Sequence, residues 1–347
     1  MDMFTTRTML PMMKTEFRAK SFLRDRYFSN VRTFDTTKLD IDIVGPNSRR
    51  MAPFVNPKVG GKALERKGFK VESYEAPELS PDMVTTAEDL LHRSPGENIY
   101  NAKSPNARAA EQLGYDLAEL DDVITRREEW MCAQALFTGK IEIKGEGYDH
   151  ELNYWSANED EQPVTTPATL WTADGCDPLA DFRAIRRGMI KDAGVTPVEC
   201  LMGTNALEVF LHQMEKRNAI LDYRRVDMGQ IDPQHLPNGV TYWGYFKDSA
   251  LDIFTYDEWY LDDDGTEKPM VPLDDVLVAG RGVRTTMAYG LVALFDRVKN
   301  MPEFHAEARV PHSWVQEKNP AGRIVQVKSR PLPIVHQTHG FHVVKPI

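Results

Sequence analysis

Three histidines near the C-terminus have the residue type and spacing of metal ligands. His336, His339 and His342 follow one another at intervals of three residues, and neutral imidazole is a common zinc ligand. On a helix they would share one face, but Pro333 and Gly340 disfavour a helix in this segment. On a strand, the same spacing puts neighbouring side chains on opposite faces. The pattern therefore favours an ordinary C-terminal segment over a zinc site.

An acidic run, Asp262-Asp263-Asp264-Gly265, offers oxygen atoms of the kind that bind calcium. A calcium loop of the EF-hand type needs an acid or amide where Tyr260 stands and a glutamate where Val271 stands. Both are missing, whereas an Asp-Gly pair is typical of a tight hairpin turn. We therefore interpret the run as a turn.

Gly60-Gly61-Lys62 has the composition of a phosphate-binding loop. However, Asn56 takes the place of the first glycine of that motif, and Ala63 replaces its hydroxyl residue. The dinucleotide motif, the serine-hydrolase elbow and the zinc-protease motif are absent from the sequence. Because carboxylates are abundant, a soluble hydrolase with an unrecognised carboxylate pair stays open as an alternative. We assign no catalytic residue, no metal ligand and no cofactor.

Charge and cysteine usage narrow the class of protein. The 347 residues carry 42 Lys and Arg against 52 Asp and Glu, a formal net charge of −10, whereas nucleic-acid binders usually carry a basic domain. Cys132, Cys176 and Cys200 form no Cys-x-x-Cys pair, and the N-terminal residues have no apolar segment typical of a secretory signal. No apolar run approaches the roughly 18 residues of a membrane span. We expect reduced, buried cysteines in a cytoplasmic protein.

An arm, two strands and a basic loop are predicted at the start of the chain. Residues 1–30 hold six basic and three acidic residues with weak helical periodicity, which is typical of an arm that packs on something larger. Apolar and charged residues alternate at 39–43 and at 69–72, the pattern of half-buried strands. Between them, the stretch 49–70 holds seven basic residues and one acid. It is either a basic projecting loop or an ordinary solvated one.

The strongest helix signal runs from Ser104 to Phe137. Ser104 can cap the helix with Pro105 at its first position, and Gly139 follows its end. Such a helix would be about 50 Å long. One apolar stripe is formed by Leu113, Leu117, Leu120, Ile124 and Met131. The opposite, outer face is expected to be acidic, with Glu119, Asp121, Asp122, Glu128 and Glu129.

Beyond this helix, hairpins, helices and strands are expected in turn. Lys140–Trp155 is predicted to be a hairpin. Asp177-Pro178 should cap a helix, and Val198–Met202 is a short apolar strand. Asn205 has capping-box spacing to Glu208 before a further helix.

The last third is predicted to be mainly strands. A second hairpin is expected from Ile253 to Val278, around a turn at Asp263-Asp264-Gly265. A further strand is expected at Ile324–Lys328.

Four blocks of sequence, in order, resemble the major capsid protein E family, the lambda-type major capsid proteins of tailed phages. The longest combines Tyr256–Leu261, the turn glycine Gly265 and Pro272–Val278, and Gly280–Arg284 follows it as in the family. The other three blocks are Phe54–Pro57, Leu136–Ile141 and Val325–Pro333. The resemblance extends from Met3 to about Val335 and so covers nearly the whole chain.

The resemblance implies an α+β capsid fold of the Hong Kong 97 type. Its parts would be an N-terminal arm (1–33), an E-loop (34–80), a P-domain (81–165 and 304–347) with a spine helix (104–138), and an A-domain (166–303). Copies would form the pentamers and hexamers of an icosahedral shell around double-stranded DNA, without reading its sequence. The implied partners are a scaffolding protein, a portal and a decoration protein, with assembly in the host cytoplasm and no membrane.

Contacts between copies are predicted from charge. The basic stretch would dock on the acidic helix of a neighbouring copy, using Arg49, Arg50, Lys58, Lys62, Arg66 and Lys67 against Asp121, Asp122, Glu128 and Glu129. The main alternative is an encapsulin-like cellular compartment, which has the same fold but encloses a cargo enzyme.

Overall fold

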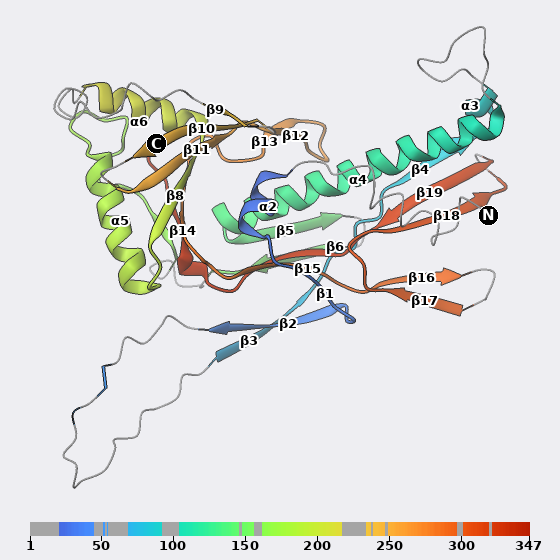
Figure 1. The fold of residues 1–347 in the computed structure, drawn as a ribbon, viewed down its shortest axis with the longest axis horizontal. Coiled ribbons are helices and arrows are strands. Elements are labelled where there is room, and N and C mark those ends of the chain that lie inside the picture. The colour runs from blue at the N-terminus through green and yellow to red at the C-terminus, as the bar shows by residue number, and fades with distance from the viewer. Residues whose placement is uncertain are drawn as a thin grey trace. The chain divides into compact units, whose positions relative to one another are not determined.

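The structure is a computed structural model of the full chain. The residues it describes are 21–44, 51–52, 54, 69–91, 104–145, 148–155, 162–216, 234–236, 239–246, 249–296, 301–318 and 321–347. Helices and strands mix throughout (Figure 1), which confirms the α+β class. No described helix is both long enough and apolar enough to cross a membrane.

The chain divides into two compact units. Unit 1 comprises residues 1–39, 74–132 and 286–334, and unit 2 comprises 40–73, 133–285 and 335–347. Each unit is therefore built from segments that are distant in the sequence, and each is described by itself below.

Unit 1 is organised around the long helix α4. Its other helices are α2 (Phe22–Tyr27) and α3 (Ala87–Leu91), and α4 itself begins at Pro105 and ends at Phe137, beyond the residues of this unit. The strands are β1 (Val31–Thr33), β4 (Asp82–Thr86), β15 (Thr285–Tyr289), β16 (Val292–Asp296), β17 (Met301–His305), β18 (Val310–Gln316), β19 (Gly322–Lys328) and β20 (Pro331–Val335). They form sheets in the orders β1-β15-β20, β18-β19-β4 and β16-β17.

The predicted boundaries and apolar stripe of α4 are confirmed. The hydroxyl of Ser104 accepts a hydrogen bond from the backbone N–H of Ala107 (3.3 Å), as an N-cap does. The stripe Leu113, Leu117, Leu120 and Ile124 packs against Val325 and Val327 of β19. Figure 1 shows α4 lying along β4 and β19. This buried contact holds the helix against the sheet.

Unit 2 is built on a seven-stranded sheet. The strand order is β7-β21-β14-β8-β11-β10-β9, with β8 parallel to β11 and antiparallel to β14. Its strands are β7 (Val164–Thr165), β8 (Pro197–Met202), β9 (Gln234–His235), β10 (Val240–Phe246), β11 (Leu251–Tyr256), β14 (Val276–Gly280) and β21 (Phe341–Val344). The helices are α5 (Pro178–Asp192), α6 (Thr204–Lys216) and the short 3-10 helix η3 (Thr338–Gly340).

Three two-stranded hairpins complete unit 2. They pair β2 (Lys38–Val44) with β3 (Phe69–Glu75), β5 (Lys140–Gly145) with β6 (Tyr148–Asn153), and β12 (Trp259–Leu261) with β13 (Glu267–Pro269). The first two confirm the strands predicted at 39–43 and 69–72 and the hairpin predicted at 140–155. The third turns at Gly265, which has a φ of 79°.

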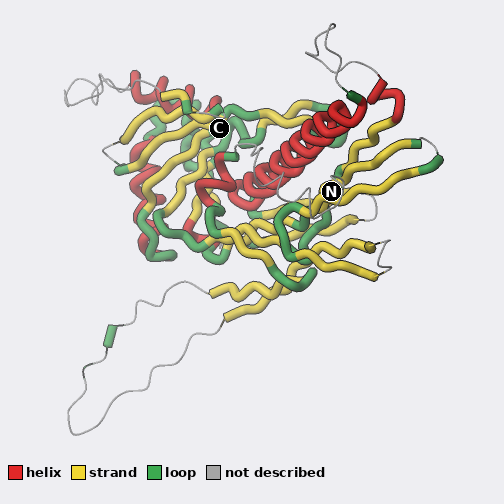
Figure 2. Tube along the Cα trace, turned by 45° about the vertical axis from the view of Figure 1, so that its right-hand side comes forward, coloured by secondary structure: helices red, strands yellow, loops and turns green. Residues whose placement is uncertain are grey.

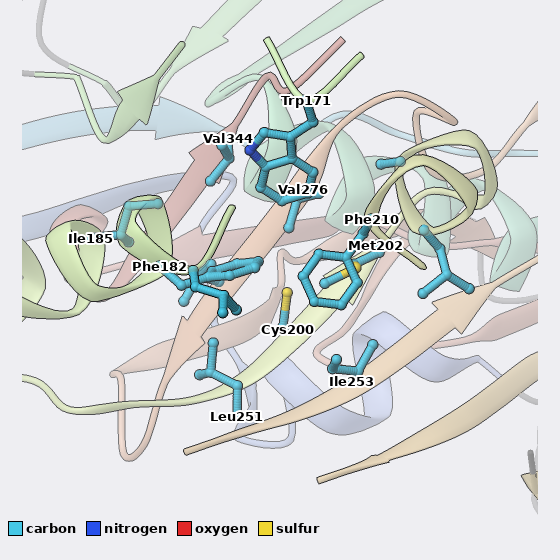
Figure 3. Packing of buried hydrophobic residues seen from close by; sticks show 14 of the residues in the cluster. Trp171, Phe182, Ile185, Cys200, Met202, Phe210, Leu251, Ile253, Val276 and Val344 are labelled. Carbon is cyan, nitrogen blue, oxygen red and sulfur yellow. The ribbon is translucent and has the colours of Figure 1, made fainter. Parts of the chain in front are cut away.

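The core of unit 2 lies between the sheet and its two helices. Trp171, Phe182 and Phe210 form a cluster of aromatic rings with centroids 5.5 to 6.0 Å apart. Figure 3 shows Phe182 and Phe210 around Cys200 of β8, and Ile253 of the neighbouring strand β11 belongs to the same cluster. Helices α5 and α6, drawn in red beside the yellow strands of this sheet in Figure 2, both contribute large apolar side chains to this core.

The predicted second hairpin is only partly correct. Its tip, β12 with β13, is a hairpin, but the outer strands β11 and β14 do not pair with each other. β8 lies between them and pairs with both. Local alternation predicts a strand but not its partner, so an interposed strand from residues 197–202 could not be expected.

The predicted capping box at Asn205 is wrong. Helix α6 begins at Thr204, which places Asn205 inside it, where its side-chain amide donates to Asp274 (2.8 Å). The N-terminus of α6 is capped instead by the segment 272–275: the N–H of Ala206 donates to the Leu273 carbonyl (3.2 Å). A Cβ on Gly203 would lie 2.2 Å from that same oxygen, so this close approach requires glycine. The cap of α5 is confirmed, because Asp177 accepts from the N–H of Ala180.

Candidate functional site: a buried charge cluster on the long helix

Four of the predicted contact residues lie on α4, and three of them are buried. Glu128 has no exposed surface, and Asp121 and Glu129 are at most 9% exposed, whereas Asp122 is half-buried. The expectation that these carboxylates form an outer face is therefore wrong for three of the four. Of the original acidic set, Glu119 is exposed as expected.

Glu128 is bridged by two arginines from distant parts of unit 1. Arg309 donates to both of its carboxylate oxygens, at 2.6 and 3.0 Å, and Arg24 donates to one of them at 2.8 Å. Arg309 also donates through its Nε to Asp121 (2.6 Å). Such paired, charge-assisted bonds satisfy carboxylates that would otherwise be costly to bury.

The charges in this cluster shift one another's pKa values. Burial alone would lower the pKa of Arg309 and of Arg24, but the Glu128 carboxylate outweighs it and raises both. Burial, together with the negative charge of Glu128, raises the pKa of Tyr289 well above its usual range. The arginines therefore stay charged and the tyrosine neutral across the physiological pH range.

Glu129 binds the first turn of α2. Its carboxylate accepts hydrogen bonds from the backbone N–H groups of Phe22 (2.9 Å), Leu23 (2.6 Å) and Arg24 (3.0 Å). The first N–H groups of a helix point away from its own carbonyl groups, so a carboxylate at this position accepts from them and meets the positive end of the helix dipole. The predicted arm is thus part of the folded unit from residue 21 onwards.

Further polar contacts extend along the same unit. Buried Asp116 accepts from Gln112 (2.7 Å) and Thr85 (3.1 Å), and burial raises its pKa. Glu78 accepts from Lys328 (2.8 Å) and Arg330 (2.6 Å), and although burial opposes it, these cations lower its pKa. Together, these bonds join α4, the segment 21–28 and the strands β4 and β19 by charge as well as by apolar packing.

The cluster holds distant segments of unit 1 together. The buried or half-buried carboxylates with printed partners, Glu78, Asp116, Asp121, Glu128 and Glu129, all accept bonds from this chain. Glu128 has no surface that a substrate could reach. Within the described residues, no group of three or more His, Cys, Asp or Glu side chains is arranged to hold a metal ion.

The histidines, the acidic run and the Gly-Gly-Lys segment singled out in the sequence have these surroundings. His342 pairs with the Thr165 hydroxyl (2.8 Å), and burial and neighbouring His339 lower its pKa to about 4. Asp262 and Asp264 both accept from Lys268, which fixes the turn. Gly60-Gly61-Lys62 lies outside the described residues.

The six basic residues predicted to contact a neighbouring copy lie in the stretch 49–67. The residues Arg49, Arg50, Lys58, Lys62, Arg66 and Lys67 all lie outside the part of the chain that the structure describes. Conversely, sequence reasoning missed Arg24, Glu78 and Arg309. Arg309 lies 181 residues from Glu128, and no local spacing signals a pair of that separation.

Comparisons with known proteins agree along the whole chain. A family model described as phage major capsid protein E matches residues 5–343. The major capsid protein of Escherichia phage lambda is 24% identical over 353 residues, which cover 98% of each chain. That of Escherichia phage N15 is also 24% identical and covers 99% of each. The crystal structure of a protein described as a prophage capsid protein of Escherichia coli CFT073 covers 99% of each chain, with a TM-score of 0.69 and 21% identity.

Proposed function

Because the chain belongs to the phage major capsid protein E family, we propose that its copies form the pentamers and hexamers of an icosahedral shell around double-stranded DNA. The chain is a major capsid protein of a tailed phage, with the Hong Kong 97-like fold and a place in the virion capsid. The observation that carries the proposal is the extent of the family match, from residue 5 to residue 343.

The parts of the subunit are assigned in the same proposal. Residues 1–33 form the arm, 34–80 the E-loop, 81–165 and 304–347 the P-domain, and 166–303 the A-domain. The buried cluster supports a structural role for α4 as the spine helix, since Glu128 and Glu129 join it to the arm. A spine fixed at several points along its length can carry load between neighbouring copies.

The partners follow from the same role. We expect a separate scaffolding protein, a portal and a decoration protein, with assembly in the host cytoplasm. The subunit itself performs no catalysis and needs no cofactor, because its function is to contact other copies. The encapsulin-like alternative and the hydrolase alternative are not favoured, since the family that matches is that of phage capsids.

Fewer carboxylates of α4 are available for the proposed contact with the basic stretch than the sequence suggests. Glu128, Glu129 and Asp121 are already bound within their own chain, so they are not available to a neighbour. Of the five acidic residues predicted for the outer face of α4, Asp122 and Glu119 reach the surface and can receive a basic loop from another copy.

Negative-stain electron microscopy of the expressed chain tests the proposal. We expect closed shells, tubes or free capsomers, first from the chain alone and then with a scaffolding protein from the same phage. A chain that stays monomeric at high concentration under both conditions would contradict the shell function.

A further inference from the structure

The hairpin of β16 and β17 in unit 1 has two faces of different character. The strands are antiparallel, with Ala293 opposite Phe304 and Phe295 opposite Pro302. Opposite residues share a face, and alternate residues along a strand point to opposite faces. These four side chains therefore lie on one face, and Val292 and Leu294 lie on the other.

The face with Val292 and Leu294 is packed against its own unit. Both side chains are buried and form a small core cluster with Val310 of β18. This contact fixes which way the hairpin faces. An isolated two-stranded sheet is marginally stable in water, so further cover would stabilise the hairpin.

The other face is apolar and exposed. Phe295 and Phe304 are 54% and 62% exposed, and Ala293 and Pro302 are exposed beside them. An antiparallel sheet with one face in water normally carries polar residues on that face. Here all four positions are apolar and none is charged. The departure from alternation marks a surface that is covered in the working state of the protein.

We propose that this face, Ala293, Phe295, Pro302 and Phe304, binds a second copy of this chain in the assembled shell. The inference rests on the proposed function and names one of the surfaces that it uses. A face without positive charge has nothing to offer a phosphate polymer. Contacts between identical subunits, by contrast, are more apolar than ordinary protein surface.

The apolar area of this face is too small for a complete interface and fits one of several contacts between copies. Its two half-exposed rings present roughly 200 Å² of apolar surface, whereas a stable interface needs about 800 Å² from each partner. The face therefore cannot hold an isolated dimer. It can contribute in a shell, where each copy touches several neighbours at once and the contacts add.

Paired substitutions of the full chain test the proposal. The double variant Phe295→Thr/Phe304→Thr keeps residues that favour strands but removes the apolar surface. We expect a folded subunit with an unchanged unfolding midpoint. The yield of closed shells should fall by a factor of roughly ten or more. The matched control, Phe295→Leu/Phe304→Leu, keeps the apolar face and should assemble nearly as wild type. Normal shells from the threonine variant would overturn the proposal.

A labelling experiment covers the case in which the threonine variant does not fold. Ala293→Cys places a small thiol on the same face, and the native Cys132, Cys176 and Cys200 are buried. A maleimide should label this thiol quickly in dissociated subunits and at least about ten-fold more slowly in shells. Equal rates in both would overturn the proposal. So would slow labelling in the free subunit, because a segment of the same chain would then cover the face.

These outcomes are separate from a failure of the proposed function. If wild-type protein forms no shells, the capsid function itself is in question. If wild-type and both double variants assemble alike, the function stands and only this surface assignment falls.

Discussion

Glu128 lies between the guanidinium groups of Arg24 and Arg309, with none of its own side chain exposed. Removing one member of a buried ion cluster costs more than the cluster contributes, because the remaining charges are left without compensation. We therefore expect Glu128→Gln to lower the free energy of unfolding by about 3–5 kcal/mol, measured by urea denaturation.

The matched control for this substitution is Glu119→Gln on the same helix. Glu119 is exposed, so the same chemical change should alter the free energy of unfolding by less than about 0.5 kcal/mol. Equal effects at the two positions would show that the cluster contributes nothing particular to stability.

His342 gives the protein a pH dependence of its own. Burial, with His339 nearby and Asp192 opposing, lowers its pKa to about 4, below the ordinary value of 6.5. The unfolded chain therefore binds the proton more readily than the folded one. Stability linked to His342 is fully present above pH 6.5 and is lost as the pH falls from 6.5 through 4.

His342→Gln removes this titration. We expect the difference in free energy of unfolding between pH 7 and pH 4.5 to be smaller in the variant than in wild type, by an amount on the order of 2 kcal/mol. Urea denaturation at both pH values measures it, and subtraction cancels the contributions of the other histidines. The same pH slope in both proteins would contradict the assignment.

At the scale of elements, the segment 21–28 belongs to the folded unit even though it precedes the first strand. Leu23 and Phe28 are fully buried, and the N-terminus of α2 is bound by Glu129. The arm predicted from the sequence thus has a structural part, beginning at residue 21, and a preceding part, 1–20, outside the described residues.

Two truncations separate the roles of these parts. Deleting residues 1–20 should leave a folded subunit with near wild-type thermal stability that fails to form closed shells. Deleting 1–28 should also remove Arg24 and the buried apolar residues, which leaves Glu128 and Glu129 without some of their partners. We therefore expect the free energy of unfolding to fall by several kcal/mol. Circular dichroism melting measures the stability of the subunit, and electron microscopy measures shell formation. Normal shells from the shorter deletion would show that residues 1–20 are not needed for assembly.

At the scale of the whole molecule and its neighbours, the charge contact can be tested by reversal. Arg49→Glu with Arg50→Glu should slow assembly while leaving the subunit folded, because repulsion replaces attraction at the contact. Adding Glu119→Lys and Asp122→Lys should restore assembly in part. Asp121 is unsuitable for this rescue, since it binds Arg309 within its own chain.

The dependence of the assembly rate on salt concentration is the matching control for the charge reversal. Each exposed pair contributes only about 0–1 kcal/mol and is screened by ions, so the assembly rate of the wild type should fall with ionic strength more steeply than that of the reversed chain. Light scattering follows the rate. Normal assembly by the doubly reversed chain would make the basic stretch an ordinary solvated surface.

Much of the fold follows from local patterns in the sequence. Spacing of three and four residues located α4 and its stripe from Leu113 to Met131, and the Ser104 cap and Gly139 marked its ends. Alternation located the hairpin at 140–155 and the strand at 324–328. These features are readable because helix and strand periods depend only on neighbouring residues, and the ordered blocks of the family resemblance gave the fold and the capsid function.

Tertiary structure alone decided which charges are buried and which strands pair. Local spacing placed Asp121, Glu128 and Glu129 away from the apolar stripe and so suggested solvent. Their burial depends on Arg309 and Arg24, which lie 181 and 104 residues from Glu128. In the same way, β8 separates β11 from β14. A single sequence carries no record of such pairings, because the energy of a buried charge is set by what packs over it and not by its position along the helix.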